Sequence, residues 1–110
     1  MSSKGTSTFV MQRASAILLL PLALWFLISL VGQVGASHAD MKAWLGAPVN
    51  ALLMALFIVI GAFHMRIGVA EVIEDYIHGG LRSVLMIANW VFAVFVALFA
   101  GWSVLTLAFG

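Results

Sequence analysis

Three apolar stretches dominate this sequence, and each is long enough to cross a membrane as a helix. They cover residues 14–34, 49–72 and 84–108, whereas about 20 helical residues suffice to cross the hydrocarbon core of a bilayer. Backbone N–H and C=O groups find no partners in lipid, which excludes open strand edges. The sequence predicts an all-α membrane protein in which three transmembrane helices form a single membrane domain over residues 1–110.

The composition excludes a soluble protein. Hydrophobic residues make up 65% of the 110 residues and charged residues 8%, against roughly 45–50% and about 25% in soluble domains. A domain of this size has too little interior to bury so much apolar surface. The net charge of +1, with no basic patch, also excludes a nucleic-acid binder. Because cysteine is absent, any redox function needs a cofactor held by other ligands.

The positive charges predict the orientation of the spans. Cytoplasmic loops carry an excess of Lys and Arg. The first link contains only Lys42, whereas the other four positive residues precede the first span or flank the second link: Lys4, Arg13, Arg66 and Arg82. We therefore expect a cytoplasmic N-terminus and a periplasmic C-terminus. The polar segment before the first span is short for an organelle transit peptide, which favours a multi-pass protein of the bacterial inner membrane.

His64 is the strongest candidate for a functional residue. An ionisable group at mid-depth in a membrane costs on the order of 2.5–3.5 kcal/mol, so each one is a candidate by default. His64 lies about 22 Å along the helix from Val49, in the cytoplasmic half of the hydrocarbon zone. From the residues alone, two interpretations stay open. The imidazole is either hydrogen-bonded to a neighbouring helix or a ligand of a metal or haem through a neutral ring nitrogen.

Other polar positions share the helix face of His64. At 100° per residue, Gly68, Glu71 and Asp75 lie within about 40° of it. Gly68 leaves space either for a flat ligand or for a close contact with another helix. Asp75 and Tyr76 lie about 17–18 Å from His64, at the cytoplasmic boundary. Tyr76 is either an interfacial anchor or a phenol that donates to a carbonyl, with the carboxylate of Asp75 moving protons.

The remaining polar residues of the spans have simpler interpretations. Arg13 begins the first span, level in depth with the end of the second, and is either a topology anchor or a bidentate partner of a buried anion. Topology alone explains Arg66. Asn89 is expected to form a hydrogen bond between helices.

Two motifs resemble a known family. The pattern His64-x-x-x-Gly68-x(6)-Asp75-Tyr76 is similar to the signature of the small hydrophobic membrane anchor of succinate dehydrogenase. The sequence Gln-Arg-Ala-Ser-Ala at residues 12–16 resembles the Arg-x-Ser/Thr-Ala motif that opens the same subunit. The chain length, the three spans and the predicted orientation agree with this family, so the resemblance covers almost the whole chain.

The resemblance implies a membrane anchor of complex II, with electrons passing from succinate through flavoprotein and iron–sulfur subunits to ubiquinone. His64 would be one axial ligand of a haem b iron, and a histidine of the cytochrome b subunit would be the other. Gly68 would lie beside the haem and Arg13 near its propionates. Tyr76 and Asp75 would line the ubiquinone site, where the iron–sulfur subunit docks. No catalytic residue is expected in this chain.

Physical chemistry agrees with these roles. One histidine cannot supply both axial imidazoles of a haem, so a second chain or a second copy must supply the other. His38 and His78 lie in the opposite link and beyond the membrane edge, which makes neither a suitable second ligand. Haem binding therefore predicts a heteromeric bundle. Reduction of a quinone takes up two electrons and two protons, so its headgroup needs hydrogen-bond donors near water.

Two other classes of function remain. A small transport or channel component could use His64, Glu71 and Asp75 as a proton or cation relay along one helix face. A purely structural anchor would need these residues only for packing. Cofactor content separates the relay from the redox hypothesis, because a relay requires no haem and no quinone. The structural anchor instead predicts that replacing His64 with an apolar residue of similar size leaves haem and activity unchanged.

Overall fold

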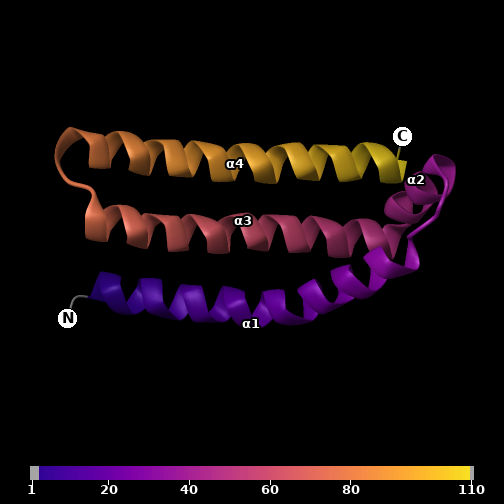
Figure 1. The fold of residues 1–110 in the computed structure, drawn as a ribbon, viewed down its shortest axis with the longest axis horizontal. Helices are drawn as coiled ribbons and strands as arrows, with labels where there is room; N and C mark the ends of the chain where they lie inside the picture. Colours follow the sequence, from indigo (N-terminus) through magenta and orange to yellow (C-terminus); the bar gives the residue numbers. More distant parts are fainter. Residues whose placement is uncertain (1–2, 110) are drawn as a thin grey trace.

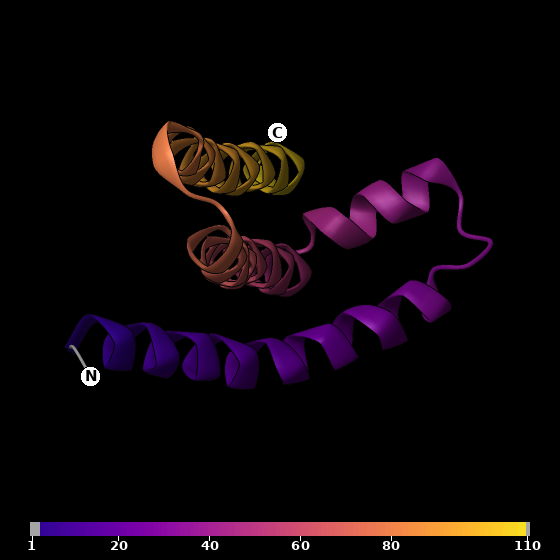
Figure 2. The same cartoon turned by 60° about the vertical axis from the view of Figure 1, so that its left-hand side comes forward.

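The computed structural model describes residues 3–109, which form four α-helices. They are α1 (Ser3–Gly32), α2 (His38–Gly46), α3 (Pro48–Tyr76) and α4 (Gly79–Phe109). The three long helices lie side by side with α3 in the middle, and α2 lies at the end that holds the C-terminus (Figure 1). Within the described part of the chain, α1 packs mainly on α3, whereas α2 contacts both α3 and α4. The view in Figure 2 shows α1 crossing on the far side of α3 from α4.

The predicted spans are confirmed as long apolar helices, but their ends differ from the prediction. α1, α3 and α4 are each long and apolar enough to cross a membrane. α1 begins at Ser3, whereas the prediction placed the start at residue 14. Hydropathy marks only the part of a helix that lies in lipid. The polar first turns of α1 are helical as well. Ser7 and Met11 in these turns line a cavity together with residues of α3 and α4.

The first link contains a helix that the sequence analysis missed. α2 is capped by Ser37, whose hydroxyl accepts a hydrogen bond from the backbone N–H of Asp40 at 3.1 Å. Pro48 then starts α3, a position at which the missing proline N–H costs nothing. A Cβ added to Gly46 would lie 2.5 Å from the Leu107 carbonyl oxygen. α2 therefore packs directly against the backbone of α4, which fixes the first link on the bundle.

The second link is much shorter than predicted. The prediction placed it at residues 73–83, whereas only residues 77 and 78 separate α3 from α4. Gly79 has a φ of +72°, which a residue with a Cβ adopts only with strain, and it allows the chain to reverse in this short space. Asp75 and Tyr76 are the last two residues of α3. They lie on the same helix as His64, as predicted.

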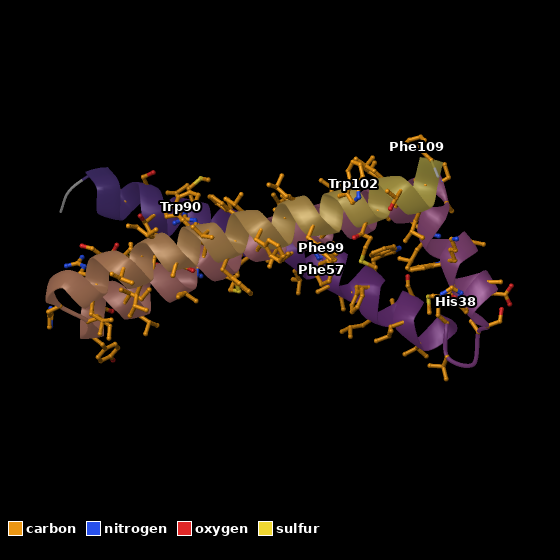
Figure 3. The ribbon with its side chains drawn as sticks, turned by 90° about the horizontal axis from the view of Figure 1, so that it is seen from above. His38, Phe57, Trp90, Phe99, Trp102 and Phe109 are labelled. Atoms are coloured by element: carbon orange, nitrogen blue, oxygen red, sulfur yellow. The ribbon has the colours of Figure 1, made fainter. Side chains whose placement is uncertain are left out.

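Small side chains and aromatic stacking hold the bundle together. Ala51, Met54 and Val104 form the buried cluster between α3 and α4. Around it, Trp25 of α1 stacks on Trp44 of α2 with ring centroids 5.8 Å apart. Large apolar side chains remain exposed along α4, among them Phe95, Phe99 and Trp102 (Figure 3). Such surface suits contact with lipid or with other membrane helices.

Candidate functional site

His64 meets α1 inside the bundle. Its side chain is half-buried on α3, and its Nδ1 lies 2.7 Å from the hydroxyl oxygen of Ser15 on α1. Ser15 is only 5% exposed. The Ser15 hydroxyl also donates a hydrogen bond to the backbone carbonyl of Gln12 at 3.0 Å. The first interpretation of His64, a hydrogen bond to a neighbouring helix, is thereby confirmed.

These two contacts bear on the tautomer of the His64 ring. A serine hydroxyl has a single proton to donate. In the structure that proton is directed to the Gln12 carbonyl. The serine oxygen can then only accept from His64, so the contact is a hydrogen bond when Nδ1–H is the donor. In the neutral imidazole, Nε2 then carries the free lone pair, which is the form that binds metal ions. The hydrogen bond to α1 is therefore compatible with metal ligation and favours the Nε2 atom as ligand.

Gly68 lies one turn further along α3, and α1 passes close to it. A Cβ added to Gly68 would lie 3.5 Å from the side-chain nitrogen of Gln12. The other polar atom of this amide, Oε1, is buried and has no hydrogen-bond partner among residues 3–109. The helix contact proposed for Gly68 is thus present. Gln12 brings an unsatisfied acceptor to the same junction, which was not foreseen from the sequence.

Arg13 lies at a different depth from the one predicted. Ser15 meets His64 and Gln12 meets Gly68, so Arg13 is level with this part of α3 and not with its end. The prediction was wrong because it assumed that the first span begins at the membrane boundary, whereas α1 starts well before Arg13. The exposed guanidinium lies over the ring of Phe9, 5.1 Å from its centroid.

Arg66 does more than set topology. Its guanidinium lies 3.9 Å from the ring centroid of Trp90 on α4, a cation–π contact. The side-chain amide of Asn89 donates a hydrogen bond to the Arg66 carbonyl oxygen at 2.8 Å. The hydrogen bond between helices predicted for Asn89 is therefore confirmed. Both contacts join α3 to α4.

Asp75 and Tyr76 form a separate and open position. Both are exposed on the last turn of α3, and Tyr76 is 76% exposed. They lie at the end of the bundle that holds the described start of α1 and the turn between α3 and α4 (Figure 1). Helix geometry places them about 17–18 Å from His64, so the structure does not bring these residues together.

A polar cavity of about 330 Å³ lies between the three long helices near the same end. Glu71 lines this cavity, whereas His64 faces Ser15. Within residues 3–109, no hydrogen bond connects His64 to Glu71 or Asp75. The shared helix face therefore does not form a continuous polar chain. The lining side chains include Thr8, Phe63, Arg66, Glu71, Glu74 and Trp90.

The other histidines are remote from His64. His38 lies at the α2 end of the molecule, far from Trp90, as Figure 3 shows. His78 is exposed in the turn between α3 and α4. In the part of the chain that the structure describes, no three His, Cys, Asp or Glu side chains gather into a group suited to hold a metal ion. The imidazole of His64 is thus a single candidate ligand.

The fold and the His64 junction define a class: a small multi-pass helical membrane subunit with an oriented imidazole inside the bundle. Comparison with known proteins gives the family. The family described as succinate dehydrogenase/fumarate reductase transmembrane subunit matches residues 1–102. The chain belongs to the succinate dehydrogenase membrane anchor subunits within it, which confirms the resemblance carried by the two motifs.

Two relatives illustrate the similarity. The succinate dehydrogenase hydrophobic membrane anchor subunit of Paracoccus denitrificans is 31% identical over 105 residues, covering 96% of this chain and 75% of the relative. The subunit of the same name from Rickettsia bellii (strain RML369-C) is 30% identical over 95 residues, covering 84% and 75%. No solved structure matches the chain significantly.

Proposed function

We propose that this chain anchors a succinate dehydrogenase in the membrane and supplies Nε2 of His64 as one axial ligand of a b-type haem. The observation that carries the proposal is the hydrogen bond between His64 Nδ1 and Ser15. Histidines that bind metals usually donate their other ring N–H to an acceptor, which fixes the tautomer and the ring orientation. A neutral imidazole bonded in this way is the donor that a haem iron takes. When bound, the haem supplies one-electron redox chemistry.

Two further residues of the junction take supporting roles. Arg13 has an exposed guanidinium at the depth of His64 and would pair with the haem propionates, since guanidinium binds carboxylates in a bidentate manner. Gly68 would keep a side chain away from the haem edge on the turn after His64. The side chain of Gln12 on α1 lies at ordinary contact distance from the Cβ position of Gly68, 3.5 Å.

The second axial imidazole would come from the cytochrome b subunit. His38 belongs to α2 and His78 to the turn after α3, so neither would complete the coordination of an iron held by His64. The exposed apolar faces of α1 and α4 suit helix packing in a heteromeric bundle. The iron–sulfur and flavoprotein subunits complete the proposed complex, in which electrons pass from succinate to ubiquinone.

Tyr76 and Asp75 would contribute to the site of ubiquinone reduction. The phenol of Tyr76 is a hydrogen-bond donor for a quinone carbonyl, and the carboxylate of Asp75 can pass protons from the aqueous phase. Their exposure on the last turn of α3 leaves both side chains free to face a partner subunit and a bound quinone. This chain supplies donors there and no catalytic group for succinate oxidation.

We also propose the orientation and the membrane. The excess of Lys and Arg places the N-terminus and the α3–α4 turn in the cytoplasm and the C-terminus in the periplasm. The relatives from Paracoccus and Rickettsia are bacterial, which supports a bacterial inner membrane.

Purification through a tag on this chain tests the proposal. We expect the flavoprotein, the iron–sulfur subunit and the cytochrome b subunit to co-purify, with succinate–quinone reductase activity and a b-type haem in the reduced-minus-oxidised absorption spectrum. A preparation without haem and without these partners would refute the proposal. Measurement of proton flux through vesicles that contain the chain would then test the relay hypothesis.

A further inference from the structure

The contact between His64 and Ser15 belongs to a short chain of hydrogen bonds that crosses from α3 to α1. His64 Nδ1 lies 2.7 Å from the Ser15 hydroxyl oxygen, and this hydroxyl donates to the backbone carbonyl of Gln12 at 3.0 Å. With the hydroxyl proton used in this way, the contact is a hydrogen bond when Nδ1–H is the donor. Ser15 is more than nine-tenths buried, so water does not compete for its hydroxyl. The acceptor for the histidine is thus built into α1, a helix separate from the one that carries the ligand.

We infer that Ser15 is a positioning residue for the haem ligand, an inference that rests on the proposed function. The backbone carbonyl of Gln12 orients the single hydroxyl proton, which leaves the serine oxygen as an acceptor for Nδ1–H. This arrangement keeps the proton off Nε2 and holds the imidazole plane. No other hydrogen-bond partner of the His64 ring occurs among residues 3–109, so the tautomer depends on Ser15.

Ser15 also acts on the electron density of the ligand. Donation of Nδ1–H to an acceptor raises the basicity of the other ring nitrogen. Because the serine hydroxyl itself donates to a carbonyl, the two hydrogen bonds polarise and strengthen each other. A more basic imidazole stabilises ferric iron over ferrous iron. The Ser15 hydroxyl therefore lowers the midpoint potential of the haem and increases the affinity of the site for it.

The test replaces Ser15 in the complete complex. Ser15→Ala removes the acceptor with little effect on helix formation, since alanine favours helices. Ser15→Thr retains a hydroxyl that can bond the carbonyl three or four residues earlier in the helix. Ser29→Ala is the matched control, because Ser29 lies on the same helix about 21 Å from Ser15. Co-purification of the partner subunits verifies that each variant assembles.

Haem retention and the midpoint potential are the two readouts. We expect Ser15→Ala to weaken haem binding by about 10-fold to 100-fold and to shift the potential of the remaining haem to a more positive value. Ser15→Thr should restore both properties, and Ser29→Ala should leave both unchanged.

The outcomes separate this inference from the proposed function. A wild-type complex without a b-type haem would refute the proposed function and the inference with it. A wild-type haem with unchanged affinity and potential in Ser15→Ala would overturn the inference alone. Equal loss in Ser15→Ala and Ser15→Thr would also overturn it, because a hydroxyl would then have no specific role.

Discussion

The two polar positions of α3, at His64 and at Asp75–Tyr76, differ in what this chain places around them. His64 is half-buried, touches α1 and has a defined hydrogen-bond partner on one ring nitrogen. Asp75 and Tyr76 stand on the last turn of the same helix, and both are exposed. We call His64 the closed position, because the fold gives it a partner on α1, and Asp75–Tyr76 the open position, because both side chains are exposed.

The two positions can therefore support different functions. A metal ligand needs a fixed tautomer and a fixed ring, and at the junction of α1 and α3 the Ser15 hydroxyl contacts one ring nitrogen of His64. A site for a diffusible quinone needs access from outside and donors that a second chain can complete. We therefore propose cofactor ligation at His64 and substrate contact at Asp75 and Tyr76.

The largest effect is expected at the closed position. His64→Leu removes the only oriented imidazole of the junction and should abolish the b-type haem of the complex, as measured by haem content per complex. His38→Leu, an exposed histidine of α2, is the control and should retain the full haem content. Full haem content in His64→Leu would show that the closed position is not the ligand site.

The next effect is expected at the open position. Tyr76→Phe and Asp75→Asn each remove one proton-transfer or hydrogen-bonding group, so we expect succinate–quinone reductase activity to fall by about 100-fold. Haem content should not change, since neither residue contacts the His64 junction. Ser83→Ala, exposed at the same end of the bundle, should leave both unchanged. Loss of haem in Tyr76→Phe or Asp75→Asn would contradict the separation of this position from the His64 junction.

A substitution at Gly68 tests how closely packed the first position is. Gly68→Ala adds a Cβ at ordinary contact distance from Gln12, 3.5 Å, and should be tolerated. Gly68→Leu extends further into the space of the Gln12 side chain and should destabilise the complex by about 1–3 kcal/mol, with a lower haem content. Thermal denaturation and haem content measure both effects. Equal stability of the two variants would mean that α1 does not pack closely here.

The smallest effect is expected between α3 and α4, away from both positions. Asn89→Ala removes the hydrogen bond to the Arg66 carbonyl, and bonds of this kind contribute about 0.6 kcal/mol in membrane proteins. We expect a slightly lower melting temperature of the complex, with unchanged haem content. Thr106→Ala, whose hydroxyl bonds only within α4, is the control. A large loss of haem in Asn89→Ala would extend the ligand site to α4.

Hydropathy predicted the three spans but not the helix ends. It detects the residues that lie in lipid, so it missed the polar start of α1 and the short α2 helix. The error in the depth of Arg13 follows directly from the first omission. Asn89 was predicted correctly, because an amide inside an apolar helix has few alternatives to a hydrogen bond with a neighbour.

The candidate site could be predicted only in part. The spacing of His64, Gly68, Asp75 and Tyr76 on one helix follows from the sequence, because helix periodicity fixes it. The contact with Ser15 depends on the register of α1 against α3, which periodicity does not give. The available signal was a serine inside an apolar span, a polar group that needs a partner in lipid.

Electron paramagnetic resonance of the oxidised complex tests most directly the claim that His64 binds the haem iron. We expect the wild-type complex to give the low-spin ferric signal of a haem with two imidazole ligands. This signal should disappear in His64→Leu and persist in His38→Leu. The same low-spin signal in His64→Leu, or no haem signal in the wild-type complex, would contradict the account.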